Sequence, residues 1–502
     1  MGLAASILRL LLAGLAAAHL IAAEPPIAPG TYRQLFVDDH LIASTTLRRT
    51  PHAVEKYPGN PVLLPVKPWE GQYALLYGTV IRDEEEGIWK AWYSTMNHFR
   101  YTQSIFPEST YLCYATSRDG IHWEKPELGL IDYRGSKANN IVFEAHELAD
   151  QQISGILDAV SILKDDRDPD RSRRYKMMIW HHNQRREGGK WVYQRREPFP
   201  TGHYVAFSPD GLRWKERPAP VFPYDPVRDT ATTMWDPLSQ EFVAFVKQHV
   251  DHKRARFISR SKDFINWSAP ERMLTADDQD PPALELYNST GFFYEGMYLG
   301  LLTVFHQESK DNLYLDIQLI SSRDGRSWRR AGDRAPVIPV GRRNVDWDFG
   351  FNSPASGTPI RVGDELWFYY SGRSYRHPVT GQGREPNHGA IGLGKLRLDG
   401  FVSMDAGPEE GTLTTKPISL SQPGVYVNAD ASRGSLSAEI LDAAGQPLPG
   451  FSKNDCAPFT GNSVHQPLRW RRPLTTLAGK SIRLKFYLRQ ASLYSFQFDA
   501  DL

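Results

Sequence analysis

Short stretches of alternating apolar and polar residues recur along the chain, and four of them end in the same turn. TYLCYATS, GHYVAFS, ARFISRS and DIQLISS each close on a serine, an aspartate follows two residues later, and a tryptophan follows four residues after that. Alternation with a period of two predicts a β-strand. The aspartate, usually with a glycine after it, predicts a tight turn. Each copy is therefore expected to be a β-hairpin whose returning strand begins with a large apolar side chain.

Two further strands are expected upstream of each hairpin, as in GTVIRDEEEGIWKAWYST and STGFFYEGMYLGLLTVF. A fifth unit, ASGTPIRVGDELWFYYSG followed by HGAIGLGKLRLDGFV, keeps the hairpin without its tryptophan. Repeats of about 50 residues with four strands are typical of β-propellers, in which each sheet is one blade. We expect a five-bladed β-propeller over residues 30–410, closed with help from the early stretch LFVDDHLIAS. The expected blades lie near 72–126, 152–218, 227–270, 284–330 and 347–404.

Residues 411–502 show alternating strands broken by glycine and proline, with no helical period. This pattern predicts a small C-terminal β-sandwich. The expected fold class is therefore all-β, a five-bladed propeller followed by a sandwich.

The first 23 residues carry one arginine and an apolar, alanine-rich run that ends in small residues before EPP. This layout predicts a signal peptide over residues 1–23, with an uncleaved anchor helix as the alternative, and hence a secreted or periplasmic protein. No later stretch has the length of a membrane span, so no membrane contact is expected after cleavage. With 59 basic and 58 acidic residues, the balance gives no indication of nucleic-acid binding.

Only two cysteines are present, Cys113 and Cys456, and they fall in different expected domains. An oxidising compartment would permit a disulfide bond, but burial as ordinary core thiols is favoured. They do not form a metal-binding pair.

Acidic residues stand where the first strand of each expected blade begins. That strand lines the central channel of a propeller, so these side chains are expected at one mouth of the channel. The five acids are Glu70, Asp158, Asp229, Glu285 and Asp348. Crowded carboxyl groups push one another's pKa values apart. Glycoside cleavage requires this state, with one acid to protonate the leaving oxygen and one carboxylate to act as nucleophile or base.

Aromatic and basic residues flank these acids and are expected to bind the substrate together with Asp348. They are Trp69, His181, Arg228, Tyr287 and Trp347. His181 and His182 are adjacent on a strand and so point to opposite faces. No third ligand is clustered with them, and we therefore expect no metal site and no cofactor, although a structural cation in the channel stays open.

The chain resembles the five-bladed propeller glycoside hydrolases, namely the invertase and fructanase family (family 32) and the arabinanase and xylosidase family (family 43). SKDFINW at 261–267 is similar to a hairpin motif of both families, and WDFG at 347–350 is similar to a channel motif. RDT at 228–230 resembles the Arg-Asp-Pro motif of the invertase family, which implies that Asp229 steadies the transition state. The nucleophile motif of that family is missing, and FVDDHLI at 36–42 occupies its region, so Asp38 and Asp39 are the substitutes. Its Glu-Cys general-acid motif is also missing.

The expected function is that of an exported glycoside hydrolase acting on a plant- or algae-type oligo- or polysaccharide. Asp229 is expected to be the ionised carboxylate, Glu285 the general acid and Asp158 the group that tunes their pKa values. The nucleophile or base is expected among Asp38, Asp39 and Glu70. Acids at strand starts also cap turns, so a non-catalytic glycan-binding propeller is one alternative. A glycoside phosphorylase or a lyase is another, and the basic phosphate pocket of a phosphorylase has one nearby candidate, Arg342 with Arg343.

Overall fold

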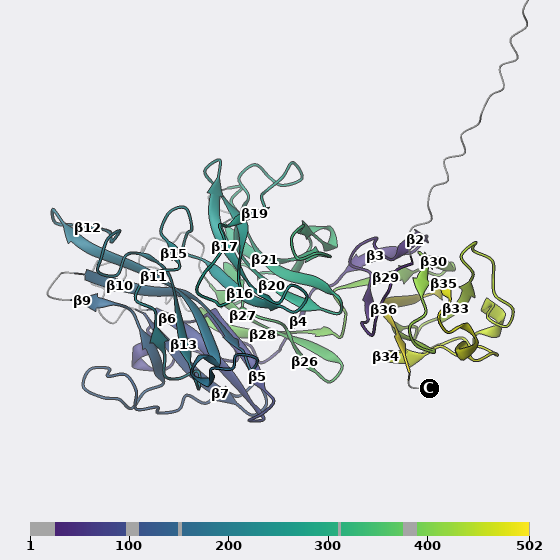
Figure 1. The fold of residues 1–502 in the computed structure, drawn as a ribbon, viewed down its shortest axis with the longest axis horizontal. Coiled ribbons are helices and arrows are strands. Elements are labelled where there is room, and N and C mark those ends of the chain that lie inside the picture. The colour runs from purple at the N-terminus through teal and green to yellow at the C-terminus, as the bar shows by residue number, and fades with distance from the viewer. Residues whose placement is uncertain (1–25, 97–109, 149–152, 310–312, 375–388, 501–502) are drawn as a thin grey trace, which may run out of the picture.

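The structure is a computed structural model that describes residues 26–96, 110–148, 153–309, 313–374 and 389–500 (Figure 1). The expected signal peptide lies outside the described residues. Within them, every regular element is a β-strand or a short 3-10 turn, which confirms the all-β prediction. The 3-10 turns are η1 (Pro68–Glu70), η3 (Arg171–Arg173), η4 (Gly332–Arg334), η5 (Lys453–Asp455) and η6 (Leu474–Leu477).

Most strands between residues 55 and 397 form five mainly antiparallel groups. The first group is β5 (Tyr73–Asp83), β6 (Ile88–Met96), β7 (Tyr111–Ser117) and β8 (Ile141–Glu144). The second is β10 (Ile153–Lys164), β11 (Tyr175–Glu187), β13 (Gly202–Ser208) and β14 (Lys215–Glu216), with β9 (Glu147–Leu148), β12 (Lys190–Tyr193) and β15 (Phe222–Pro223). The third is β16 (Ala231–Asp236), β17 (Glu241–Val250), β18 (Lys253–Ser261) and β19 (Glu271–Leu274).

The fourth group is β20 (Glu285–Tyr294), β21 (Met297–His306), β22 (Tyr314–Ser322), β23 (Arg329–Arg330) and β24 (Pro336–Ile338). The fifth is β25 (Phe351–Pro354), β27 (Glu365–Arg373) and β28 (Gly389–Arg397), with β4 (Glu55–Lys56) and β26 (Ile360–Val362).

The first strands of the five groups contact one another in chain order, and β25 contacts β5 again. Polar residues join these strands by hydrogen bonds. Those bonds connect Ser161 Oγ with Thr233 Oγ1 (2.9 Å), Thr232 Oγ1 with the Ser289 carbonyl (2.7 Å), Thr79 Oγ1 with Ser356 Oγ (2.6 Å), and the Ile162 N–H with Thr79 Oγ1 (2.9 Å). The five inner strands therefore form a closed ring.

The repeated turns have the local chemistry that the sequence predicts. The Gly120 N–H donates to Ser117 Oγ (2.9 Å), and the Ile121 and His122 N–H groups donate to Asp119 Oδ1 (2.8 Å each). The same bonds recur in the three other turns, which begin at Ser208, Ser261 and Ser322. Serine and aspartate thus satisfy the turn's backbone donors in all four copies.

The tryptophans that follow these turns pack between neighbouring strand groups. Trp328 is buried, with its ring centroid 5.5 Å from that of Phe245 in the third group and 6.3 Å from that of Tyr298 in the fourth. The residue after the aspartate has a positive φ, 68° at Gly325 and 66° at Phe264. Phe264 tolerates this conformation as a fully buried residue packed on Phe242 and Trp267.

The ring is closed by a different N-terminal segment from the one expected. Strand β4 pairs with β28, with Lys56 opposite Gly394. The stretch LFVDDHLIAS instead contributes β1 (Gln34–Leu35) and β2 (Ile42–Thr45), and these pair with strands beyond residue 410. The expectation that LFVDDHLIAS closes the ring is therefore wrong, since its backbone donors and acceptors are used by C-terminal strands.

The remaining strands form two sheets that lie beside the ring (Figure 1). One sheet contains β3 (Arg48–Pro51), β29 (Val402–Ala406), β36 (Ala491–Asp499), β32 (Gly424–Asp430) and β34 (Asn462–Pro467), with β1. The other contains β2, β30 (Gly411–Thr415), β35 (Ser481–Arg489), β31 (Ile418–Ser419) and β33 (Ser435–Leu441). Buried residues of both sheets, among them Val427, Leu484, Phe486 and Phe496, share one apolar core.

Cys113 and Cys456 are both buried free thiols, which confirms the prediction for them. Among the described residues, no helix has the length and apolar character needed to cross a membrane.

Candidate active site

Three of the expected carboxylates lie on or next to consecutive inner strands. Asp229 comes two residues before β16, and Glu285 is the first residue of β20. Asp158 is the sixth residue of β10, so the expectation that it stands at a strand start is wrong. The Ser161–Thr233 hydrogen bond joins β10 to β16, so Asp158 and Asp229 lie on the same side of one strand contact. They are close enough for the charge of Asp229 to act on Asp158.

Lys247 holds Asp229 in its ionised form. Its Nζ lies 2.5 Å from Asp229 Oδ1, and its side chain is 3% exposed whereas that of Asp229 is 42% exposed. Strand register brings the two together, because Val246 on β17 pairs with Ala231 and the Lys247 N–H donates to the Thr230 carbonyl. Burial opposes ionisation, but the ion pair with Lys247 holds the pKa of Asp229 well below its ordinary value.

Asp158 has the opposite environment. Burial, together with the negative charge of Asp229, raises the pKa of Asp158 to about 6. The pKa values of the two neighbouring carboxyl groups are thus widely separated. In mildly acidic solution Asp229 is ionised while Asp158 holds its proton. Paired carboxyl groups with such separated pKa values are the usual mark of acid and base roles.

Glu285 is bound to a base of its own. Arg254 Nη1 donates to Glu285 Oε2, and the Glu285 side chain is 16% exposed. Glu285 therefore lies at the start of an inner strand, as expected, and is held there by Arg254.

Arg256 is fully buried and bonds to the strands that carry these residues. Its guanidinium donates to Ser289 Oγ (3.0 Å), Thr230 Oγ1 (3.1 Å) and the carbonyls of Tyr287 (3.1 Å) and Phe245 (3.0 Å). These bonds tie β18 to the start of β20 and to the residue after Asp229.

Aromatic rings surround the carboxylates, as the sequence predicts for Tyr287. The Lys247 Nζ lies 4.3 Å from the centroid of the Tyr287 ring, and the Tyr287 and Phe351 rings meet edge to face at 5.4 Å. Arg373 covers the Phe351 ring at 4.4 Å and the Tyr77 ring at 5.4 Å. The pKa of Tyr77 is raised by burial and by the nearby Tyr287, and the charges of Asp158 and Asp229 also act on it. All these groups therefore belong to one site.

A column of stacked rings lies beside Asp229. His182 stacks on Tyr193 at 4.5 Å, and Tyr193 stacks on Tyr224 at 4.6 Å. Arg228, an expected binding residue, covers Tyr224 at 4.6 Å and pairs with Asp225 at 2.9 Å. Burial lowers the pKa of His182 to about 4 although the charge of Asp229 opposes this, so His182 is neutral near pH 7.

Asp348 and Trp347 are placed differently from the three carboxylates. Asp348 is buried, accepts a hydrogen bond from Tyr370 Oη (2.8 Å), and pairs with Lys56 of the closing strand β4 (2.6 Å). Trp347 stacks on Tyr370 at 5.8 Å. These contacts fasten β4 to the fifth strand group.

Glu70 also has a structural role, because its carboxylate is occupied by hydrogen bonds and an ion pair. It is buried, and it accepts hydrogen bonds from the Lys67 N–H (2.7 Å) and Tyr93 Oη (2.5 Å) and pairs with Lys125 (2.6 Å). Its neighbour Trp69 donates to Asn140 Oδ1 at 2.7 Å. Both residues thereby anchor η1 to the first strand group.

Asp38 lies at the other end of the fourth strand group from Glu285. It accepts hydrogen bonds from Arg323 (2.9 Å) and Arg329 (2.5 Å). Arg323 follows Ser322, which pairs with Tyr298 at the end of β21 remote from the Phe305–Glu285 pair. Strands of this length separate their ends by about 25 Å. Asp39 is 79% exposed and pairs with Arg49, so neither aspartate joins the three carboxylates.

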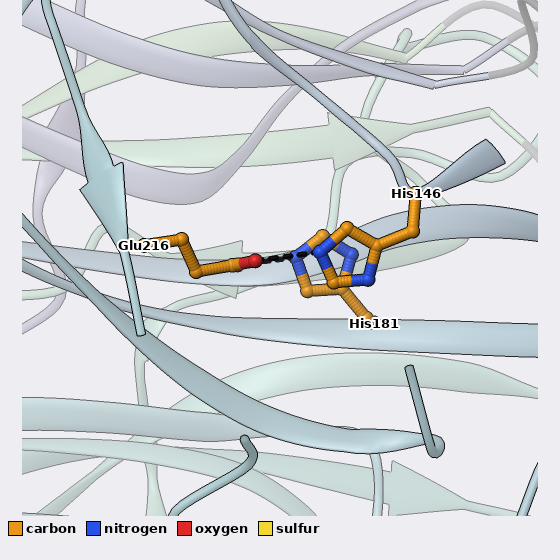
Figure 2. Close-up of side chains that lie close together, drawn as sticks. All are labelled: His146, His181 and Glu216. Atoms are coloured by element: carbon orange, nitrogen blue, oxygen red, sulfur yellow. Dashed lines mark hydrogen bonds and ion pairs between the residues drawn. The ribbon is translucent and has the colours of Figure 1, made fainter. Parts of the chain in front are cut away.

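His181 belongs to a separate group with His146 and Glu216, in which the other two side chains are partly exposed (Figure 2). His146 Nε2 lies 2.5 Å from Glu216 Oε2, His181 Nε2 lies 2.8 Å from Glu216 Oε1, and the two imidazole rings stack at 4.0 Å. His181 is fully buried and is thus no channel-lining residue. Burial opposes the shift, yet the two histidines hold the pKa of Glu216 down at about 2.

Two imidazoles and a carboxylate are a donor set that zinc accepts. Asn183 Nδ2, however, donates to the Phe199 carbonyl (3.0 Å) and faces His146 Nδ1 (3.2 Å). His146 Nδ1 is therefore an acceptor, and His146 Nε2 carries the proton that it donates to Glu216. As arranged, both imidazoles face Glu216, while the buried atoms His181 Nδ1 and Asn183 Oδ1 have no hydrogen-bond partner among the described residues.

The basic residues of the site were not among those predicted from the sequence; they are Lys247, Arg254, Arg256 and Arg373. The first three lie in KQHVDHKRAR at 247–256, where basic residues interrupt strands that are otherwise apolar. A base within a buried strand pattern is a signal for a buried ion pair or a site.

No protein-family model matches the chain, and no curated protein matches it in sequence. Among solved structures, it is similar to an N-acetylgalactosamine deacetylase from F. plautii, with 14% identity, coverage of 71% of this chain and 96% of that one, and a TM-score of 0.45. It is similar to a glycosyl hydrolase from Bacteroides ovatus, with 12% identity, coverage of 69% and 94%, and a TM-score of 0.46. It is also similar to exo-inulinase from Aspergillus awamori, with 11% identity, coverage of 87% and 99%, and a TM-score of 0.42. Likeness at this level assigns no activity, which has to follow from the site.

Proposed function

We propose that this protein is an exported glycoside hydrolase. In this proposal the five strand groups are the blades of a five-bladed β-propeller, the two adjacent sheets are a β-sandwich, and the first 23 residues are a signal peptide. The substrate is an oligo- or polysaccharide of plant or algal type that enters the mouth at which Asp158, Asp229 and Glu285 lie.

The observation that carries the proposal is the placement of Asp158 and Asp229 in one aromatic site with opposite electrostatic environments. Glycosidases of both stereochemical outcomes need one carboxyl group that gives a proton and one carboxylate that attacks or activates water. Lys247 supplies the charge that keeps Asp229 ionised. Burial and the negative charge of Asp229 favour the protonated form of Asp158.

The chemistry then runs by displacement at the anomeric carbon. Asp158 gives its proton to the glycosidic oxygen as the bond between that oxygen and the anomeric carbon breaks. Asp229 takes a proton from the water that forms the new bond in a single displacement, or it forms the new bond itself, and water then displaces Asp229 from the anomeric carbon with Asp158 taking the proton of that water. Glu285, fixed by Arg254, is then a third carboxylate that orients the sugar. This assignment gives Asp158 the acid role that the sequence analysis gave to Glu285.

The test is sugar release from a broad glycan panel by the wild type and by Asp229→Asn, Asp158→Asn and Glu285→Gln. Asp364→Asn is the matched control, because Asp364 is an exposed aspartate in the turn between β26 and β27. We expect losses of about 100-fold or more for Asp229→Asn and Asp158→Asn, and wild-type release by the control. Unchanged release by Asp229→Asn would remove it from the reaction.

A glycan-binding propeller without catalysis is the competing function, favoured by the ring column at His182, Tyr193 and Tyr224. A binding protein would retain a glycan on the same panel and release no sugar, and the Asp158→Asn variant would bind it as the wild type does.

A further inference from the structure

Three of the five inner strands contain a β-bulge close to the site. In β5, residues 76–78 stand opposite the single residue Tyr93 of β6. In β10 the pairing shifts just after Asp158, and in β20 the extra residue is Tyr287. A bulge next to an active site commonly re-aims a side chain, so these irregularities change the directions of the side chains around the carboxyl groups.

Tyr77 is the central residue of the β5 bulge. Its carbonyl accepts a hydrogen bond from Ser94 Oγ (2.9 Å), so a side chain of the neighbouring strand holds the bulged backbone. The next residue has to be glycine, because a Cβ at Gly78 would lie 2.0 Å from the Trp92 carbonyl oxygen. The backbone at Tyr77 is therefore fixed in an irregular conformation by the residues around it.

The Tyr77 ring is buried and is held by its neighbours without help from its hydroxyl. Tyr77 is 6% exposed. Its ring meets the Phe351 ring edge to face at 6.4 Å, and the Arg373 guanidinium lies over it at 5.4 Å. These contacts involve the ring alone, so they fix where the ring lies and leave the hydroxyl to other partners.

Tyr77 lies beside the two carboxyl groups to which the proposed reaction is assigned. It lines one small cavity together with Ala159 and Ala231. Ala159 directly follows Asp158, and Ala231 comes two residues after Asp229. The charges of both aspartates act on Tyr77, which agrees with this placement.

The Tyr77 hydroxyl has no hydrogen-bond partner among the described residues. Buried tyrosine hydroxyls usually have one. Several others in this protein do, namely those of Tyr93 with Glu70 (2.5 Å), Tyr204 with the Pro200 carbonyl (2.7 Å), Tyr298 with Asp236 (2.7 Å) and Tyr369 with the Gly120 carbonyl (2.6 Å). A hydroxyl taken out of water without a partner lowers stability, and a ligand that bonds to it removes that cost.

The hydroxyl is available as a donor. Burial, together with the nearby Tyr287 and the charges of Asp158 and Asp229, raises the pKa of Tyr77 well above its ordinary value. The phenol therefore keeps its proton, and a protonated phenol donates one hydrogen bond. The hydroxyl oxygens of a sugar are acceptors for such a donor.

We propose that the Tyr77 hydroxyl donates a hydrogen bond to a hydroxyl oxygen of the sugar unit whose glycosidic bond is cleaved. The inference rests on the proposed function and adds a substrate contact that was not among the residues predicted from the sequence. Hydrogen bonds to the sugar hydroxyl beside the anomeric carbon strengthen in the transition state of glycosidases. Tyr77 is then a substrate-binding residue whose bonding is completed by the sugar.

Tyr77→Phe tests this, because the substitution removes the hydroxyl oxygen and keeps the ring that packs on Phe351. The measurements on the full-length protein are kcat and KM on the glycan that the panel identifies and the midpoint of unfolding in urea. We expect kcat/KM to fall about tenfold, with most of the loss in kcat. We expect the midpoint to equal or exceed that of the wild type, because the hydroxyl has no partner to lose.

Tyr369→Phe is the matched control. Tyr369 is similarly buried, at 4% exposed, but its hydroxyl donates to the Gly120 carbonyl in the first repeated turn. Ser117 of that turn pairs with Trp89, which pairs with Arg82 near the end of β5. We expect the control to unfold at lower urea, since a buried carbonyl loses its donor, and to keep the kcat/KM of the wild type.

The outcomes separate this inference from the proposed function. If Asp229→Asn loses sugar release while Tyr77→Phe keeps the kcat/KM of the wild type, the contact is overturned and the hydrolase stands. A lower midpoint in Tyr77→Phe, as in the control, would reveal a structural partner of the hydroxyl and would also overturn the inference.

Binding decides the case in which the wild type retains a glycan and releases no sugar, which would remove the hydrolase. A dissociation constant about threefold or more higher in Tyr77→Phe would support the contact, and an equal constant would overturn it. A wild type that neither cleaves nor binds any glycan of the panel would contradict both the contact and the hydrolase.

Discussion

Replacing Lys247 by methionine should shift the pH dependence of activity, because Lys247 is the group that keeps Asp229 ionised. Its Nζ lies 2.5 Å from Asp229 Oδ1, and its side chain is buried. At an effective dielectric constant of about 20, two unit charges 4 Å apart attract each other by about 4 kcal/mol. Because 42% of the Asp229 side chain is exposed, water screens the pair and we expect about 1–2 kcal/mol.

An interaction of about 1.4 kcal/mol corresponds to one pKa unit. Removing Lys247 should therefore raise the pKa of Asp229 by about one unit or more. Asp229 would take up a proton earlier as the pH falls, so the acid limb of the kcat/KM profile moves to higher pH. Near the optimum, we expect kcat to fall about tenfold, since the carboxylate also loses the contact that orients it.

The assay is the profile of kcat/KM from pH 3 to pH 9 on the glycan that the panel identifies, for the wild type, Lys247→Met and Lys247→Arg. Lys247→Arg keeps the charge and should restore most of the activity with the acid limb near its original place. If Lys247→Met has the kcat and the acid limb of the wild type, Lys247 does not control Asp229 and the assigned electrostatics are refuted.

Three further predictions concern other parts of the molecule. Since Asp158 acts with its proton bound and has a pKa of about 6, kcat/KM should fall as the pH rises through about 6; a profile that is level to pH 8 would exclude it as the acid. Glu216→Gln should lower the free energy of unfolding in urea at pH 7 by about 1–3 kcal/mol, and because the pKa of Glu216 is lowered in the fold, this difference should shrink as the pH falls from about 4 toward 2; a difference that stays constant over that range would contradict the network. Trp328→Ala should cost about 3–5 kcal/mol in the same assay, since its ring packs between two strand groups; a loss below about 1 kcal/mol would contradict that packing.

The sequence was sufficient to predict the repeated turns, because their hydrogen bonds join residues that are close together in the chain. The turns at Ser117, Ser208, Ser261 and Ser322 are satisfied by side chains within two or three residues of the backbone groups that they bind. Four copies of such a turn, with strands between them, therefore predict the repeated hairpins without any long-range information.

The strand starts at Asp229 and Glu285 could also be predicted, because the ring brings equivalent positions together, whereas Asp158 lies within β10 and not at its start. The bases beside them could not be, since Lys247 reaches Asp229 only through the register of β16 with β17. The expectation that an acid at a strand start faces the site was wrong for Asp348 and Glu70, which have structural partners instead. Their roles depend on Lys56 and Lys125, which lie 292 and 55 residues away in the chain.

The pairing of the N-terminal strands could not be predicted from the sequence. Gln34 pairs with Phe496, and an alternating pattern predicts a strand but does not predict its partner. The stretch around Asp38 suited a propeller strand as well as a strand of the adjacent sheets, so the pairing, and the arginine partners of Asp38, became apparent only in the fold.

The most direct test of the central claim is sugar release by the wild type and by Asp229→Asn from a broad glycan panel. The account predicts release by the wild type and a loss of about 100-fold or more in the variant, in a variant that still unfolds in one cooperative transition although it has lost the partner of Lys247. Equal release by the two proteins would contradict the assigned site, and absence of release by the wild type from every glycan would contradict the hydrolase.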